Sequence, residues 1–127
     1  MEKHHPRVLL IDDDLDFLES TRLVLQSKYE VDTASSGEEG LRKARGSQPD
    51  VILLDIIMPF TDGFSVAKSL KKVPRLAKVP VLMLTSFSER VGESTIPVSR
   101  GYELEAEDYI AKPVTPDELL RRVAQWV

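Results

Sequence analysis

The sequence has 127 residues, 42% hydrophobic and 30% charged, which is the length and composition of one globular domain rather than of a disordered or low-complexity chain. It contains no cysteine, which excludes disulfides, cysteine-ligated metal centres and a cysteine nucleophile. The net charge of −4 argues weakly against nucleic acid as the main partner, and the lack of a signal-peptide core or of any apolar run near ~18 residues indicates a cytoplasmic protein without membrane contact.

The first two predicted elements are a buried strand and an amphipathic helix. Residues 8–11 form a continuous apolar run, which is typical of a strand buried on both faces of a sheet. Residues 15–27 carry apolar side chains at helical spacing, among them Phe17, and Asp14 is placed to cap this helix.

The middle of the chain continues the alternation of strands and helices. Residues 29–33 alternate in polarity and predict a more exposed strand, and residues 51–54 form a second buried run. Ser36 is placed to cap a second helix, in which Gly40 indicates close packing against the sheet. Residues 63–72 predict a third helix.

The last part of the chain predicts two further strands and a final helix. Residues 81–84 form a buried run, and 109–111 form a short candidate fifth strand. The final helix begins with a capping box, with Thr115 as N-cap, Pro116 in the first helical position and Glu118 in the third. Alternating strands and helices predict an α/β fold with a parallel sheet.

The segment 87–107 should form the helix between the last two strands, but it suits a regular helix poorly. It contains Gly92, Pro97 and Gly101, and inside a helix a proline costs ~3 kcal/mol and a glycine ~1 kcal/mol. We therefore expect a short, broken or partly loop-like fourth helix, with a regular helix after Pro97 as the alternative.

Polar side chains follow the buried strands at the point where each strand ends. The set is Asp12 and Asp13, Asp55, Thr85 and Ser86, and Lys112. The carboxyl ends of parallel strands line one crevice, so these side chains should meet there. Clustered carboxylates repel one another unless a counter-charge such as Mg²⁺ is present. With a lysine and a hydroxyl donor beside them, they suit phosphoryl transfer onto a carboxylate.

Taken in order, these motifs resemble the receiver domain of two-component response regulators over nearly the whole chain. The resemblance rests on Asp12-Asp13-Asp14, Asp55 followed by Met58-Pro59 and Asp62-Gly63, Thr85-Ser86, and Tyr109-Ile110-Ala111-Lys112-Pro113. It implies a flavodoxin-like, doubly wound five-stranded parallel sheet in the order 2-1-3-4-5, flanked by about five helices. Residues 1–127 would then be a single receiver domain with no output domain in this chain.

The resemblance also assigns roles around the strand ends. Asp55 would accept the phosphoryl group, and Mg²⁺ would be held by Asp12, Asp13, Asp55 and the backbone carbonyl of Ile57. Thr85 and Lys112 would each contact a phosphoryl oxygen.

A conformational switch follows from the same resemblance. Tyr109 would be the switching aromatic and would move inward as Thr85 engages the phosphoryl group, and Lys112-Pro113 would be a cis peptide. The change would reach the face formed by the fourth helix, fifth strand and fifth helix.

The implied function is a phosphorelay signalling switch that catalyses its own phosphorylation and dephosphorylation. The donor would be a histidine kinase or phosphotransfer protein, and the target would be a downstream protein or a covalently linked output domain. No direct contact with nucleic acid is expected.

Three alternatives differ in class. An interaction module that acts without phosphorylation stays open. An aspartyl-phosphate phosphatase of the haloacid-dehalogenase type is disfavoured because there is no room for a cap domain. An FMN binder is disfavoured because no phosphate-cradling loop follows the first strand.

Overall fold

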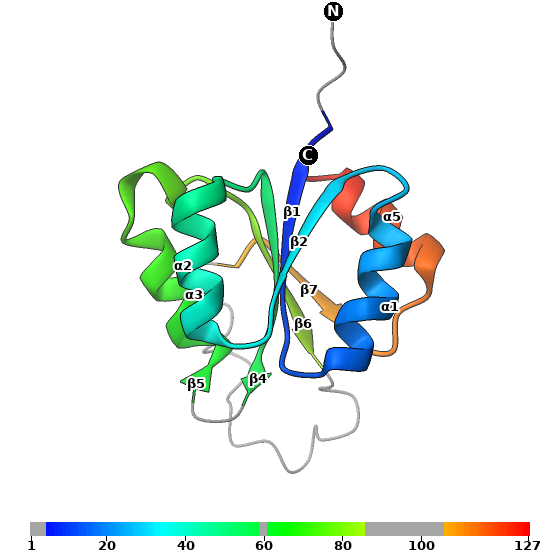
Figure 1. Ribbon diagram of the computed structural model, residues 1–127, viewed down its shortest axis with the longest axis horizontal. Helices are drawn as coiled ribbons and strands as arrows, with labels where there is room; N and C mark the ends of the chain where they lie inside the picture. The colour runs from blue at the N-terminus through cyan, green and yellow to red at the C-terminus, as the bar shows by residue number, and fades with distance from the viewer. Residues whose placement is uncertain (1–4, 59–60, 86–105) are drawn as a thin grey trace, which may run out of the picture.

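A five-stranded parallel sheet forms the middle layer of the computed structural model, which describes residues 5–58, 61–85 and 106–127 (Figure 1). The strands lie in the order β2-β1-β3-β6-β7. Their bounds are β1 Arg7–Ile11, β2 Glu30–Ala34, β3 Val51–Asp55, β6 Val81–Thr85 and β7 Asp108–Ala111. Counted along the chain, this is the order 2-1-3-4-5, so the expected doubly wound sheet is confirmed.

Helices cover both faces of the sheet, as Figure 1 shows. One face carries α1 (Leu15–Leu25) and α5 (Pro116–Ala124), and the other carries α2 (Gly37–Ser47) and α3 (Gly63–Lys71). A short 3-10 helix, η1 (Pro74–Leu76), follows α3. The described residues therefore contain four α-helices, against about five expected; the predicted broken helix falls at 87–107, and all but its last two residues lie outside the described ranges. No helix in the described part of the chain has the length and apolarity to cross a membrane.

The two faces of the sheet form two separate apolar layers. Alternate strand residues contribute to one layer and then to the other, so each central strand is apolar throughout. The layer under α2 and α3 includes Leu9, Ile11, Ile52, Leu54 and Met83. The layer under α1 and α5 includes Val8, Leu10, Leu53, Leu82 and Leu84.

Helix caps lie where the sequence predicted them. Asp14 accepts a hydrogen bond from the Phe17 backbone N–H at 3.1 Å, and Ser36 caps α2 in the same way. At α5, Thr115 accepts from the Glu118 N–H at 3.2 Å, but the Glu118 carboxylate pairs with arginines of its own helix. Only the first half of the predicted capping box is therefore formed at α5.

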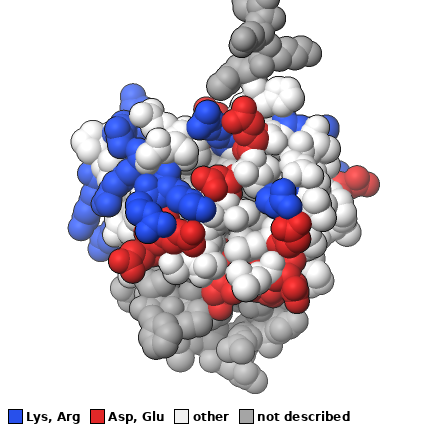
Figure 2. All heavy atoms as spheres, in the orientation of Figure 1, with Lys and Arg blue, Asp and Glu red and all other residues white. Residues whose placement is uncertain are grey.

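Surface charge is unevenly distributed. Lys and Arg side chains gather over α2, α3 and η1 (Figure 2). Exposed members of this group are Arg42, Arg45, Lys68, Lys72, Arg75 and Lys78. The overall charge of −4 therefore does not describe this side of the molecule.

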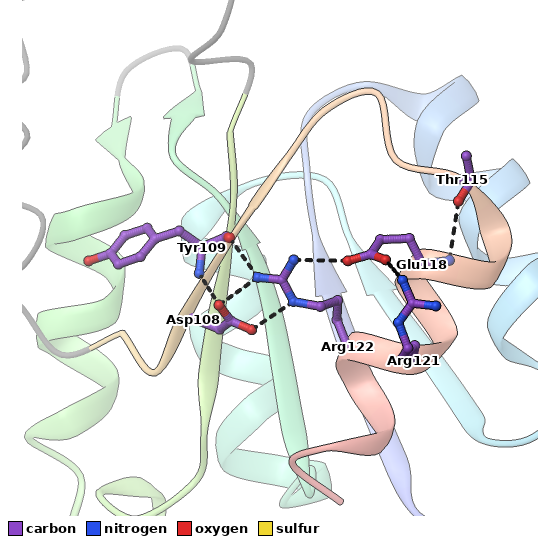
Figure 3. A network of polar contacts seen from close by, with 6 residues as sticks. All are labelled: Asp108, Tyr109, Thr115, Glu118, Arg121 and Arg122. Atoms are coloured by element: carbon purple, nitrogen blue, oxygen red, sulfur yellow. Dashed lines mark hydrogen bonds and ion pairs between the residues drawn. The ribbon is translucent and has the colours of Figure 1, made fainter.

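Arg122 fastens β7 to α5 (Figure 3). Its guanidinium donates two hydrogen bonds to the Asp108 carboxylate, at 3.0 and 2.7 Å, and one to the Tyr109 carbonyl at 2.9 Å. It also donates to Glu118 at 3.1 Å. Partial burial raises the pKa of Asp108, but the Arg122 hydrogen bonds and the Tyr109 N–H outweigh it, so the pKa is lowered.

Gly40 lies against the sheet, as its position in a predicted helix indicated. A Cβ atom there would lie 2.5 Å from Ile11 Cδ1, and Ile11 is fully buried. Gly46, on the same helix, would meet nothing within 4 Å.

This pair of glycines gives a matched test of packing. We expect Gly40→Ala to lower the free energy of unfolding by about 1–3 kcal/mol, because the buried Ile11 side chain must be displaced. Gly46→Ala should raise it by about 0.5 kcal/mol, since alanine restricts the unfolded chain and fits an open helical position. Urea unfolding measures both, and equal changes in the two variants would contradict this account of Gly40.

Arg122 and its neighbour Arg121 give a second matched pair. Arg122→Met should lower the free energy of unfolding at pH 7 by about 1–2 kcal/mol, because three acceptors lose a partly buried cation. Arg121→Met should change it by no more than about 0.5 kcal/mol, since Arg121 is exposed and pairs at the surface with Glu118. Because the Asp108 pKa is lowered, the Arg122 effect should be present at neutral pH and shrink as the pH falls through that pKa. An Arg122 effect that does not change with pH would show that Asp108 is not the partner that matters.

Candidate functional site

Strand register brings the predicted polar residues to one edge of the sheet. Asp12 and Lys112 each follow the last residue of a strand, while Asp55 and Thr85 are themselves the last residues of β3 and β6. Backbone hydrogen bonds continue past the strand ends, from Asp12 N–H to the Ala34 carbonyl at 3.0 Å and from Lys112 N–H to the Thr85 carbonyl at 2.6 Å. The positions of these residues are therefore fixed by the sheet itself.

Three carboxylates converge at this edge. Asp12, Asp13 and Asp55 each have an oxygen atom within 4.8 Å of the others. Asp12 is fully buried and Asp55 is 5% exposed, while Asp13 is exposed to solvent. An exposed carboxylate at the mouth and two buried ones behind it form an open acidic pocket.

Lys112 is the cation of the pocket. Its Nζ lies 2.6 Å from Asp12 Oδ2 and 3.5 Å from Asp55 Oδ1. The ammonium also lies over the ring of Phe17, 4.2 Å from the centroid. Among the described residues, one lysine thus faces two buried carboxylates, and these side chains together carry an excess of negative charge.

Burial and the neighbouring charges shift the pKa of Asp55. Burial raises its pKa, the neighbouring Asp12 raises it further, and Lys112 only partly opposes them, with a smaller contribution from Asp13; the resulting pKa is about 7. Within the part of the chain that the structure describes, the charge that compensates this carboxylate is therefore insufficient.

The donor set fits a hard divalent cation. Carboxylate oxygens are what Mg²⁺ prefers, and a second positive charge beside Asp55 would favour its ionised form. Ile57, the fourth predicted ligand, begins a two-residue strand, β4 (Ile57–Met58), that pairs antiparallel with β5 (Thr61–Asp62). That the backbone carbonyl of Ile57 binds the metal stays a prediction.

After β5, the chain passes close to the backbone of Asp55. The Gly63 N–H donates to the Ile56 carbonyl at 2.6 Å, and a Cβ atom on Gly63 would lie 2.5 Å from the Asp55 carbonyl oxygen. The start of α3 therefore packs against the backbone that carries the candidate acceptor, which only glycine permits. Asp62-Gly63 was one of the motifs on which the family resemblance rests, but neither this close backbone contact nor the β4–β5 pairing was predicted from the sequence.

The remaining predicted residues fall around the pocket in different ways. Thr85 is buried, at 8% exposure, at the end of β6. Tyr109 is partly buried against the apolar layer under α2 and α3, and its ring points away from Asp108 and Arg122 (Figure 3). The Lys112-Pro113 peptide is cis, as predicted. Ser86 lies outside the described residues.

A groove of about 930 Å³ extends from the acidic pocket between α1 and the start of α5. One end is formed by Asp12, Asp13, Asp55 and Lys112. Its walls are largely apolar and include Phe17, Val24, Val114, Pro116 and Leu119. The helical spacing of Phe17 predicts only a packing role in α1, because such spacing does not show whether a side chain reaches the acidic end of a groove.

Comparisons with known proteins agree on one family. The family model for the response regulator receiver domain matches residues 8–124. The probable transcriptional regulator ycf27 of Pyropia yezoensis is 38% identical over 97% of this chain and 48% of its own length. The transcriptional regulatory protein PrrA of Mycobacterium leprae is 43% identical over 93% of this chain and 48% of its own length. The chain spans about half the length of these relatives.

Solved structures of the same family match nearly the whole of this chain. The chemotaxis protein CheY4 of Vibrio cholerae superposes with a TM-score of 0.85 at 31% identity, covering 97% of this chain and 99% of that one. A putative response regulator from Chloroflexus aurantiacus superposes with a TM-score of 0.80 at 35% identity, covering 95% of this chain and 96% of that one.

The raised pKa of Asp55 predicts a pH-dependent stability. A carboxyl group whose folded pKa is raised stabilises the fold at low pH and loses that contribution as the pH rises through about 7. Asp55→Asn removes the charge, so in EDTA we expect it to raise the free energy of unfolding by about 1–2 kcal/mol at pH 8, allowing for screening, and by much less at pH 5.

Urea unfolding at the two pH values measures this gain. Asp50→Asn, which lies just before the opposite end of β3, is the matched control. Its change in the free energy of unfolding should be no larger at pH 8 than at pH 5. An equal change in the free energy of unfolding of Asp55→Asn at both pH values would show that the fold does not raise the pKa of the Asp55 carboxyl group.

Proposed function

We propose, because the chain belongs to the family of response regulator receiver domains, that it is a phosphorylation-controlled signalling switch in which Asp55 is the phosphoryl acceptor. The observation that supports this most directly is the position of Asp55 at the end of β3, with Asp12, Asp13 and Lys112 around it. The donor would be a histidine kinase or phosphotransfer protein.

The proposed reaction is attack by an Asp55 carboxylate oxygen on phosphorus. A P–O bond to Asp55 forms as the bond between phosphorus and the donor nitrogen breaks, and the donor histidine keeps the electron pair. Asp12, Asp13, Asp55 and the Ile57 carbonyl would hold Mg²⁺, which supplies neutralising charge. Lys112, which already reaches Asp55, would pair with one phosphoryl oxygen, and the Thr85 hydroxyl would donate to another.

Signal output would start from Thr85 and Tyr109. Thr85 ends β6, and its register partner Ala111 lies on the same strand as Tyr109, so the two side chains belong to adjacent strands. Arg122 holds the Tyr109 carbonyl and the neighbouring Asp108 carboxylate on the α5 side. The Tyr109 ring lies on the other face, so it would change position while the strand backbone stays fixed.

The partners follow from the same proposal. Some relatives are about twice as long as the segment that this chain matches. One is the DNA-binding dual master transcriptional regulator RpaA of Synechocystis, of which this chain covers 47%. We propose that residues 1–127 form a receiver domain that acts in the cytoplasm on a downstream protein or on a linked output domain. This receiver would not itself bind nucleic acid.

Phosphoryl acceptance is tested by intact mass after incubation with acetyl phosphate. We expect one phosphoryl group to be added to the wild-type chain with Mg²⁺, little without it, and none to Asp55→Asn, because that variant lacks the nucleophile. Asp117→Asn, which changes an exposed carboxylate on α5, is the matched control and should react like the wild type.

The same experiment separates the two candidate functions. Addition that persists in Asp55→Asn would place the acceptor elsewhere. No addition to the wild-type chain under any condition would favour the alternative, a receiver-like interaction module that acts without phosphorylation.

A further inference from the structure

The Lys112 ammonium has a third neighbour besides its two carboxylates. The Phe17 ring lies 4.2 Å from Nζ, close enough for a cation–π contact, while Asp12 Oδ2 is at 2.6 Å and Asp55 Oδ1 at 3.5 Å. The lysine side chain is 19% exposed, so the ring replaces part of the solvent that would otherwise surround the ammonium.

The position of the ring is fixed by the loop that carries the acidic pocket. Phe17 lies in the first turn of α1, where its N–H donates to the N-cap Asp14 at 3.1 Å. Asp14 in turn donates its own N–H to Asp12 Oδ1 at 3.0 Å. The ring also packs against the apolar layer under α1 and α5. Asp12 and the ring therefore reach Lys112 from two ends of one hydrogen-bonded segment.

We infer that Phe17 is a positioning residue for Lys112, an inference that rests on the proposed function of the pocket. The two carboxylates that hold the ammonium are also the oxygens a divalent cation would take. An aromatic face is no ligand for a hard cation such as Mg²⁺, so the contact with Phe17 does not compete with metal binding. It keeps a long, flexible side chain at the pocket when the carboxylates are engaged elsewhere.

The alternative is that Phe17 only packs. Phe17→Leu separates the two roles, because leucine fills apolar space but has no π face. Phe17→Tyr restores the face with the same ring geometry. A third variant, Val24→Ala, alters the wall of the same groove and serves as the matched control.

The first readout is the chemical shift of the Lys112 side-chain protons in the metal-free protein. We expect an upfield ring-current shift of the Cε protons in the wild type, in Phe17→Tyr and in Val24→Ala, and its loss in Phe17→Leu. Unshifted Lys112 protons in the wild type, or unchanged ones in Phe17→Leu, would overturn the inference. This readout requires neither Mg²⁺ nor phosphorylation.

The second readout is the rate of phosphorylation by acetyl phosphate with saturating Mg²⁺. A contact of this kind predicts a rate about threefold lower in Phe17→Leu and restored in Phe17→Tyr. Equal rates in the leucine and tyrosine variants, with the wild type active, would overturn the positioning role and leave the proposed function intact. A wild type that accepts no phosphoryl group would overturn both, since the positioning role concerns that reaction, and shifted Lys112 protons would then report a structural contact only.

Discussion

The contact between the Lys112 ammonium and the buried carboxylates of Asp12 and Asp55 is the interaction around which the site is arranged. It joins the end of β7 to the ends of β1 and β3, at 2.6 and 3.5 Å. Among the described residues this one cation does not balance the carboxylates, and burial together with the nearby Asp12 raises the pKa of Asp55 to about 7. The imbalance makes the pocket receptive to further positive charge and defines what it can bind.

The sheet determines this geometry more than the loops do. Parallel register sets Asp55 opposite Leu84 and Thr85 opposite Ala111, and Asp12 and Lys112 are held by backbone hydrogen bonds one residue beyond their strands. Since both sheet faces are covered by helices, no side chain of the central strands can turn outward without leaving an apolar layer. The backbone therefore fixes where the site residues lie, and the proposed switch is assigned to a side chain beside them, that of Tyr109.

The sequence contained enough information for the strands and for the convergence of their ends, because apolar runs and the polar residues after them are local signals. It also predicted the caps at Asp14, Ser36 and Thr115. Other features depend on contacts that have no local pattern. The β4–β5 hairpin has two-residue strands, and Gln48 ends α2 with a φ of 51°, a conformation that glycine or asparagine would signal more clearly. Phe17 fits a packing stripe equally well whether or not its ring meets a lysine.

Placing uncompensated carboxylates in a buried pocket lowers the stability of the metal-free fold, and the surrounding structure offsets that loss. Both apolar layers include residues of β1, β3 and β6, and Arg122 adds a separate polar connection between β7 and α5. Gly63 lets α3 begin against the backbone of Asp55 itself, so the end of β3 is supported by α3 as well as by the neighbouring strands. Because the support comes from the sheet and the helices, the pocket can keep an excess of negative charge at one edge while the remainder of the domain stays well packed.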